Sequence, residues 1–205
     1  MEHALLTTAM ARVPGPVTVV TTVDGSGRRW GFTATSFSSV SLDPPLVLVC
    51  LDKKASSHPA FTAARHLMVN VLAHGQEEVA RRFAASGTDR FSDGDMRPCE
   101  LGLPGLPGAC VRVACSMHRI VDAGDHSILL GRVEQTHVSD RTPLLYCNRA
   151  FARPSPENSA EYPPPRPRGS RDTAACPPAR PGRDAAPTGL PPLPAARRPG
   201  DKELL

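Results

Sequence analysis

The residues of this chain best suited to contact a ligand are small hydroxyl side chains that cluster early in the sequence. Six of the nine residues from 33 to 41 carry a hydroxyl group: Thr33, Thr35, Ser36, Ser38, Ser39 and Ser41. A hydroxyl or amide that stays unpaired in a protein core costs about 1–3 kcal/mol, so a polar partner is expected for such a run. A flat, phosphorylated ligand would supply that partner. The alternative is an ordinary Ser/Thr-rich loop solvated at the surface.

A second hydroxyl-rich turn follows the next apolar segment. Ser56 and Ser57 precede Pro59, and Ser57 is a good N-cap for a short helix that runs to about Arg65. The free amides and the dipole at a helix N-terminus suit a phosphate group, and Lys53 or Lys54 would add positive charge. This turn is therefore either a second cradle for the same phosphorylated ligand or a plain capped helix.

The elements that must position these residues are mainly strands. Apolar and β-branched runs predict strands at residues 17–23, 30–35, 46–51, 67–72, 109–121 and 127–138, with a last short strand at 142–146. Short helices are predicted at 5–12, 57–65 and 76–85. In the third helix Val79, Ala80 and Phe83 are expected to face inward, and Arg81 and Arg82 to face solvent. The connections read as hairpins without βαβ alternation, which favours a closed or half-closed antiparallel barrel.

Motifs for other kinds of chemistry do not fit this chain. The pair Gly25 and Gly27 reads as a hairpin turn and not as a dinucleotide fingerprint, because position 30 is Trp and a strand follows. The sequence contains no G-x-S-x-G motif, no paired acids in one loop and no His/Cys cluster. No cysteine spacing indicates zinc, so no metal site is expected.

The overall composition excludes several classes of protein. The net charge of +4 over 205 residues gives no support for nucleic-acid binding. Residues 1–12 lack the basic start and apolar run of a signal peptide, and no segment approaches the ~20 apolar residues of a membrane span. These features predict a cytoplasmic protein without a membrane segment, whose six cysteines are mostly reduced and structural.

The chain divides into two parts at about residue 153. We expect one domain over residues 1–153 and a Pro-rich, disordered tail over residues 154–205, which holds 14 of the 23 prolines. Such a segment cannot bury enough apolar surface to offset its ordering entropy. The tail is either a docking segment for a partner or a featureless extension.

Three stretches of the sequence together match a known family. Residues 31–47, GFTATSFSSVSLDPPLV, closely resemble the signature of the flavin reductase-like family. The apolar strand at 67–72 with its central Asn70, and the Gly-Asp-His turn at 124–126 with the strand after it, also match. The resemblance covers about residues 5–150 and implies an FMN-binding split barrel, mainly β, antiparallel and Greek-key-like, with a few short helices. It further implies a homodimeric NAD(P)H:flavin oxidoreductase that supplies reduced FMN or FAD to a partner monooxygenase.

The resemblance also implies a set of site residues. Those expected to meet the flavin and its phosphate are Thr33, Thr35, Ser36, Phe37, Ser38, Ser39, Ser41, Cys50, Asp52, Lys54, Ser56, Ser57, Arg90 and Phe91. His126 and Tyr146 match positions on the nicotinamide side. Taken alone, Phe91 reads as a core anchor and His126 as a turn histidine bonded to its own loop. The chemistry needs little else, because its main task is to hold two flat rings about 3–3.5 Å apart.

One stretch departs from the family pattern. The family usually ends with an aromatic and basic segment that contributes to nicotinamide binding, whereas here Tyr146 is followed by CNRAF and then the Pro-rich tail. The rival function is therefore a flavin-binding split-barrel protein without reductase activity, and a third is a Pro-rich interaction protein whose barrel is only a scaffold. The sequence does not separate FMN from FAD or NADH from NADPH. A pair of arginines beside the nicotinamide would favour the 2′-phosphate, but the sequence does not place one.

Overall fold

The computed structural model describes residues 3–155 of the chain. The predicted Pro-rich tail lies outside these residues, apart from Pro154 and Ser155. The expected boundary at residue 153 therefore stays a prediction.

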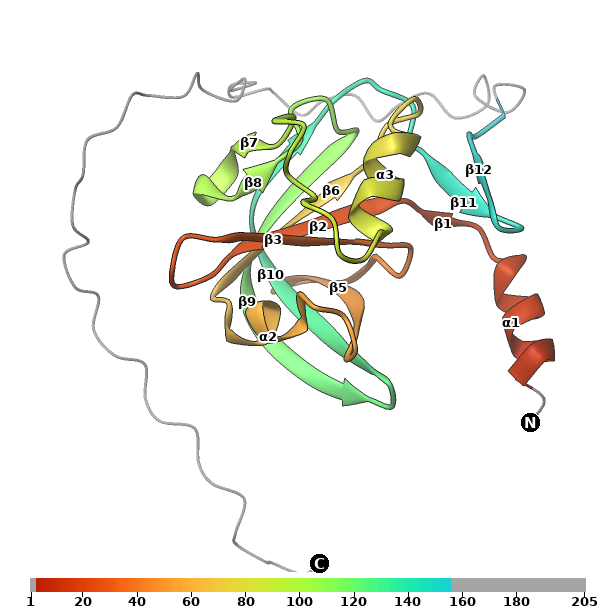
Figure 1. Cartoon of the computed structure of the whole chain (residues 1–205), viewed down its shortest axis with the longest axis horizontal. Helices are drawn as coiled ribbons and strands as arrows, with labels where there is room; N and C mark the ends of the chain where they lie inside the picture. Colours follow the sequence, from red (N-terminus) through yellow and green to blue (C-terminus); the bar gives the residue numbers. More distant parts are fainter. Residues whose placement is uncertain (1–2, 156–205) are drawn as a thin grey trace, which may run out of the picture.

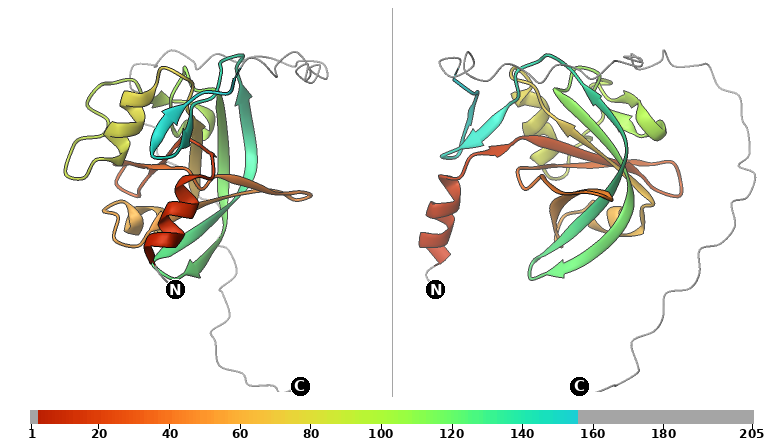
Figure 2. Two further views of the ribbon diagram at one scale, coloured as in Figure 1. Left: turned by 90° about the vertical axis from the view of Figure 1, so that its right-hand side faces the viewer. Right: turned by 180° about the vertical axis from the view of Figure 1, so that it is seen from behind.

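A seven-stranded antiparallel sheet forms the body of the molecule (Figure 1). Its strands, in spatial order, are β3 (Arg29–Ala34), β2 (Thr18–Val23), β6 (His66–Val71), β9 (Val111–Ala123), β10 (His126–Val138), β5 (Pro45–Asp52) and β4 (Ser38–Leu42). The long β9–β10 hairpin has two register shifts, and the sheet curves strongly in the views of Figure 2. Because β3 and β4 end the order without pairing with each other, the barrel is open on that side. The mainly β, antiparallel split barrel expected from the sequence is confirmed.

Smaller elements surround this barrel. Strands β1 (Gly15–Pro16), β11 (Leu145–Cys147) and β12 (Ala150–Ala152) form a three-stranded sheet, and β7 (Arg97–Pro98) pairs with β8 (Pro104–Gly105) next to a 3-10 turn at Glu100–Gly102. The helices are α1 (His3–Ala11), α2 (His58–Ala63) and α3 (Glu77–Ala84). Over the described residues, no helix has the length and apolar character that a membrane crossing would need.

Two apolar clusters stabilise the arrangement. Inside the barrel, Phe32 of β3 meets Phe61 of α2 edge to face, with ring centroids 4.9 Å apart. Under α3, Phe83 meets Phe91 in the same way at 5.1 Å. Helix α3 buries Ala80 and Phe83, as the apolar spacing predicts. These clusters fix α3 against β3, which is where the hydroxyl-rich segment begins.

Two local features differ from the expectations. Residues 38–42 form the edge strand β4 and are not part of a loop, because Asp43, Pro44 and Pro45 reverse the chain and pair it with β5. Arg82 does not face solvent freely: its guanidinium pairs with Asp93 and Asp95, and its side chain is largely buried. A charged side chain can occupy a buried position when partners of opposite charge lie within reach, and the helical spacing alone does not reveal them.

Candidate functional site

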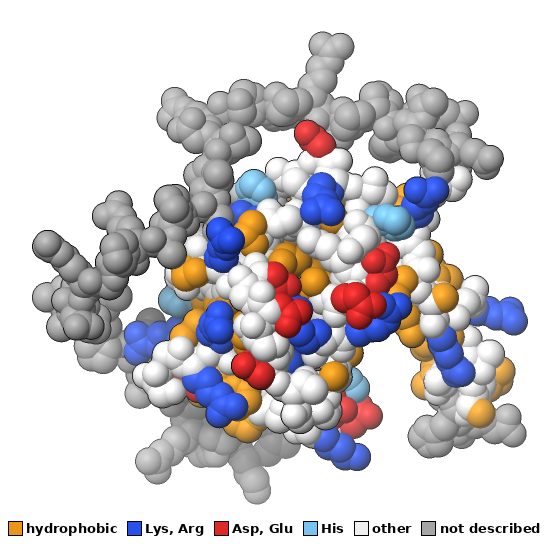
Figure 3. Space-filling view, turned by 45° about the horizontal axis from the view of Figure 1, so that its top comes forward, with side chains coloured by type: hydrophobic (Ala, Val, Ile, Leu, Met, Phe, Trp, Pro, Cys, Tyr) orange, Lys and Arg blue, Asp and Glu red, His pale blue; other side chains and the backbone are white. Residues whose placement is uncertain are grey.

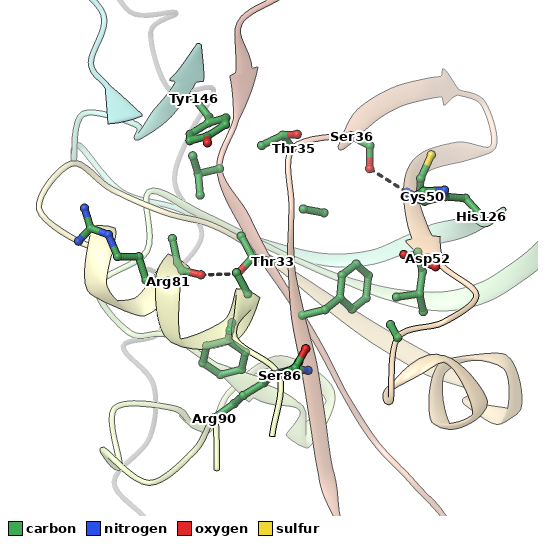
Figure 4. Close-up of a pocket in the computed structure, with 18 of the residues that line it drawn as sticks. Thr33, Thr35, Ser36, Cys50, Asp52, Arg81, Ser86, Arg90, His126 and Tyr146 are labelled. Atoms are coloured by element: carbon green, nitrogen blue, oxygen red, sulfur yellow. Dashed lines mark hydrogen bonds between the residues drawn. The ribbon is translucent and has the colours of Figure 1, made fainter. Parts of the chain in front are cut away.

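A single large cleft of about 1250 Å³ opens on the side of the barrel where β3 and β5 approach α3 and the β11–β12 hairpin. Its floor is apolar, and the residues that form it are Val17, Phe32, Ala34, Leu51, Ala80 and Phe83. Polar residues rise on both sides of this floor, and Figure 4 shows ten of them. Ligand sites for drug-sized molecules measure about 300–1000 Å³, so this cleft has room for more than one small ligand.

The first half of the hydroxyl run lines the cleft. Thr33 donates its hydroxyl to the carbonyl oxygen of Ala80 on α3 at 2.7 Å, while Ser36 Oγ accepts the backbone N–H of Cys50 at 2.9 Å (Figure 4). Thr35 lies between them and is exposed. Thr33 therefore joins β3 to α3, whereas Ser36 keeps its own hydroxyl proton to donate to a ligand.

The second half of the run leaves the cleft. Ser38, Ser39 and Ser41 lie on the edge strand β4 and are not among the lining residues, and Phe37 packs against the core clusters. Two other residues of the expected set also lie elsewhere. Ser57 is fully buried, and its Oγ has no hydrogen-bond partner among residues 3–155. Phe91 is a core residue against Phe83, the placement that its residue type alone suggests.

The end of β5 and the tip of the β9–β10 hairpin form one side of the cleft. Asp52, Lys54 and Ser56 line it, and Asp52 Oδ1 accepts the Lys54 N–H at 2.8 Å. Lys53 ties this segment to the hairpin tip through an ion pair with Asp122 at 2.6 Å and a bond to the Gly124 carbonyl oxygen at 2.7 Å. Residues 52–56 and the hairpin tip are thus held together.

His126 lies at that hairpin tip and lines the cleft beside Cys50 and Asp52 (Figure 4). Its Nδ1 is 2.7 Å from Asp125 Oδ1, and this bond lowers the pKa of the Asp125 carboxyl. His126 therefore combines the two features expected of it: a hydrogen bond within its own turn and a position at the cleft. One ring nitrogen is thus occupied by Asp125, which orients the imidazole and leaves Nε2 for a ligand.

Arg90 lines the cleft but uses its donors on the protein itself. Its guanidinium donates to the carbonyl oxygen of Gly31 at 2.5 Å and twice to that of Ala85, and burial lowers its pKa. Arg82 in turn donates to the carbonyl oxygen of Arg90 at 3.0 Å. These bonds fasten residues 85–95 onto β3. Arg90 therefore shapes the wall of the cleft more than it offers charge to a ligand.

The opposite side of the cleft contains residues that the sequence did not point to. Arg81, Arg149 and Phe151 line it together with Tyr146, which was expected there. Phe151 meets Tyr146 with ring centroids 5.4 Å apart, and the Arg81 guanidinium lies 5.1 Å from the centre of the Phe151 ring. The sequence could have indicated Phe151, because a tight hairpin would pair it with Tyr146, five residues earlier. It gave less indication of Arg81, because one solvent-facing helix position looks like another in the sequence.

The arrangement suits a flat, phosphorylated ligand such as a flavin. The apolar floor can take the ring system, Ser36 and the amides of β3 and β5 can meet polar ring edges, and Lys54 with Ser56 can meet a phosphate. The floor also depends on close packing, since a Cβ built at Gly31 would lie 2.7 Å from Phe83 Cε1. Of the expected flavin and nicotinamide residues, the structure brings together Thr33, Thr35, Ser36, Cys50, Asp52, Lys54, Ser56, Arg90, His126 and Tyr146.

Comparisons with known proteins agree with this picture. Residues 10–155 match the family model described as flavin reductase like domain. The chain is 43% identical over 152 residues to the actinorhodin polyketide dimerase of Streptomyces coelicolor, covering 74% of this chain and 86% of that protein. It is 44% identical over 155 residues to the NADH:riboflavin 5′-phosphate oxidoreductase of Streptomyces pristinaespiralis, covering 74% of this chain and 88% of the relative.

Among solved structures, the NADH:FAD oxidoreductase of Streptomyces globisporus in complex with NAD and FAD fragments superposes with a TM-score of 0.72. The two chains are 40% identical, and the match covers 76% of this chain and 94% of that one. The barrel and the cleft therefore lie in the part of the chain, residues 10–155, that matches the family model.

Proposed function

Because this chain belongs to the flavin reductase like family, we propose that it is an NAD(P)H-dependent flavin reductase that reduces FMN or FAD. One observation carries the proposal: a single cleft joins an apolar floor, a hydroxyl and lysine side, and an aromatic and basic side. Two ligands with flat rings and phosphates can lie there together. The relatives from Streptomyces pristinaespiralis and Streptomyces globisporus are named for this reaction with NADH.

The residues of the cleft act by binding and orienting. The floor around Phe32 and Ala34 excludes water from one face of a ring system, and Ser36 donates a hydrogen bond at its edge. Lys54 and Ser56 meet the phosphate of the flavin. When bound, the flavin accepts the hydride that the reduced nicotinamide donates, so no nucleophile or paired carboxylates are required of the protein.

The nicotinamide is placed by residues on both sides of the floor. Tyr146 and Phe151 offer an aromatic surface, and His126 can donate or accept at its free ring nitrogen. The departure at CNRAF does not remove the aromatic and basic character of this end, because Phe151 and Arg149 both line the cleft. This favours a reductase over the rival, a flavin-binding protein that lacks reductase activity.

Steady-state oxidation of NADH and NADPH with added FMN or FAD tests the proposal. A reductase shows turnover that saturates with flavin. Flavin binding of ordinary affinity without any nicotinamide oxidation would select the rival, and the absence of both would leave only the scaffold function.

The reduced flavin is proposed to leave for a partner monooxygenase. One relative is named as the reductase component of a flavin-dependent trigonelline monooxygenase, and a structural neighbour as the flavin reductase component of a two-component tryptophan halogenase. Several cleft residues, including Thr35, Lys54 and Ser86, are exposed to solvent, so a ligand in the cleft stays accessible. To check the transfer, a purified oxygenase is supplied with its substrate, this chain and NADH. Formation of the hydroxylated product should require both this chain and NADH.

We further propose that the chain forms a homodimer. Helix α1 extends away from the barrel in Figures 1 and 2, and its Leu5 and Met10 are 68% and 57% exposed. Figure 3 shows apolar side chains on this outlying arm. Exposed apolar surface of this kind marks an interaction site, and a second copy of the chain would cover it. A mass in solution close to twice 21.8 kDa would support the dimer.

The expected cytoplasmic location is also retained as a proposal. Nicotinamide nucleotides, which the proposed reaction consumes, are found in the cytoplasm. Fractionation of cells that express the chain tests this.

A further inference from the structure

The turn between β11 and β12 has an unusual backbone. Cys147 pairs with Ala150, so Asn148 and Arg149 form a two-residue hairpin turn. Both have positive φ, 50° for Asn148 and 60° for Arg149. Turns of this kind strongly favour Asn-Gly, because a side chain at the second position is disfavoured in the left-handed region. Arg149 therefore occupies a position where glycine would be more stable.

The position of Arg149 in the cleft suggests why the chain keeps a residue with a disfavoured backbone conformation there. Arg149 lines the cleft, and no hydrogen bond or ion pair joins its side chain to residues 3–155. A residue held in a sparsely populated backbone region without a structural partner points toward a role at a ligand. Arg149, with its disfavoured backbone conformation, lies on the side of the cleft opposite Lys54 and Ser56.

Arg81 supplies a second positive charge at the same end. It lies in the last turn of α3, pairs with Glu78, and places its guanidinium over the Phe151 ring, two residues from Arg149 in the hairpin. Phe151 also meets Tyr146 edge to face, so the three side chains are in contact at this end of the cleft. Guanidinium groups bind phosphate oxygens with directed, charge-assisted hydrogen bonds.

The charge of the whole cleft agrees with more than one phosphate. One Lys and three Arg residues line it, namely Lys54, Arg81, Arg90 and Arg149, and Asp52 is the only acidic residue that does so among residues 3–155. Arg90 is occupied by backbone carbonyl oxygens. Lys54 serves the flavin phosphate on one side, which leaves Arg81 and Arg149 on the other.

We propose that Arg81 and Arg149 form a second phosphate subsite, which binds a phosphate of the nicotinamide dinucleotide. This inference rests on the proposed function for the identity of the ligand. The phosphate belongs either to the pyrophosphate, which NADH and NADPH share, or to the 2′-phosphate of NADPH. Both have the chemistry that two guanidinium groups recognise.

The test uses the full chain and two matched variants. Arg149→Gly removes the guanidinium and the disfavoured conformation together. Asn148→Gly relaxes the neighbouring position of the same turn and keeps Arg149. Equilibrium binding of ADP-ribose and 2′-phospho-ADP-ribose is measured by titration calorimetry, with FMN binding measured separately. These ligands carry the phosphates but no nicotinamide, so the result does not depend on turnover.

We expect Arg149→Gly to weaken binding of the dinucleotide fragment about tenfold, the size of one charge-assisted hydrogen bond. FMN affinity should stay within about twofold, and Asn148→Gly should change neither affinity. Loss for both fragments assigns the subsite to the pyrophosphate, and loss for 2′-phospho-ADP-ribose alone assigns it to the 2′-phosphate. In addition, Arg149→Gly should melt no lower than the wild type, because glycine suits the turn.

Two results would overturn the subsite. One is equal fragment affinity in Arg149→Gly and Asn148→Gly, and the other is a loss that falls on FMN instead. Neither is the same as failure of the proposed function, which would appear as fragment binding at Arg149 without any nicotinamide oxidation.

Discussion

Ser36 shows most clearly how one side chain can serve both the fold and the ligand. Its Oγ accepts the Cys50 N–H and so joins the end of β3 to β5, the two strands that flank the cleft floor. Within residues 3–155 its Oγ donates no hydrogen bond, so its proton is available to a ligand. Ser39, three residues later, lies exposed on β4 and outside the cleft. Ser36 thus belongs to the half of the hydroxyl run that lines the cleft, and Ser39 to the half that lies outside it.

Replacing Ser36 by Ala should raise the Kd for FMN about tenfold, because a bond to the ligand is lost and the Cys50 N–H is left without its acceptor. Fluorescence quenching of FMN by the protein measures this. Ser39→Ala is the matched control and should bind FMN like the wild type. Equal affinities in the two variants would mean that Ser36 does not bond to the flavin.

Cys115 offers a test of burial through its acidity. Burial raises the pKa of its thiol to about 12, whereas an unburied thiol titrates near 9.0. Iodoacetamide at pH 9 should therefore label Cys50 before Cys115, as read by mass spectrometry of the native protein. Rapid labelling of Cys115 in the folded state would contradict the buried position of β9.

The same pKa shift predicts how stability depends on pH. The unfolded chain loses the Cys115 proton near pH 9, while the folded chain keeps it up to about pH 12. The stability that this group contributes is thus fully present below pH 9 and is lost as the pH rises above it. Urea unfolding at pH 8 and pH 10 should show a smaller drop in the Cys115→Ala variant than in the wild type.

At the scale of the elements, β3 and α3 together determine the cleft floor. Thr33 bonds to Ala80, Arg90 bonds to Gly31, and Phe83 packs directly over Gly31. A Cβ at Gly31 would lie 2.7 Å from Phe83 Cε1 and 3.1 Å from the Val20 carbonyl oxygen. Glycine is therefore required here by the close approach of a ring, and not by a turn.

Gly31→Ala should lower the free energy of unfolding by about 1–3 kcal/mol, as overpacking in a core does. Urea denaturation measures this. Gly25→Ala is the control, because a Cβ there meets no atom of the described residues within 4 Å. It should stay within about 0.5 kcal/mol of the wild type. If both variants are equally stable, α3 does not pack on β3 as described.

The elements also show what the sequence could and could not predict. The apolar and β-branched runs located β2, β5, β6, β9 and β10 to within a few residues, because buried strands need such side chains. Strand β4 was missed, since an exposed edge strand of serines has no apolar alternation to reveal it. The roles of Arg81 and Arg149 depend on a hairpin that folds back beside α3, and contacts between segments so far apart leave no local pattern.

At the scale of the whole molecule, α1 extends away from the barrel (Figures 1 and 2). Its Leu5 and Leu6 are 68% and 48% exposed, and the proposed second copy of the chain would cover them. The cleft is built from β3, β5, α3 and the β11–β12 hairpin, and residues 3–11 do not line it. The proposed dimer and the proposed flavin site can therefore be tested separately.

The double variant Leu5→Glu, Leu6→Glu should halve the mass in solution, because two charges would be placed in the proposed contact. Light scattering coupled to gel filtration measures this. Thr7→Glu provides a control for added charge on the same helix. A dimer that survives the double change would show that α1 is not its interface.

The most direct test of the central claim asks whether this cleft is where the flavin is reduced. Ala84 lines the cleft and is exposed at the end of α3, so Ala84→Trp fills the cleft without disturbing the core. Ala63→Trp adds the same ring at the exposed end of α2, away from the cleft. The measurement is the anaerobic loss of oxidised-FMN absorbance when NADH or NADPH is mixed with each protein. We predict rapid bleaching with the wild type and Ala63→Trp, and a rate at least tenfold lower with Ala84→Trp. Bleaching at the wild-type rate in Ala84→Trp, or none with any of the three proteins, would contradict the account.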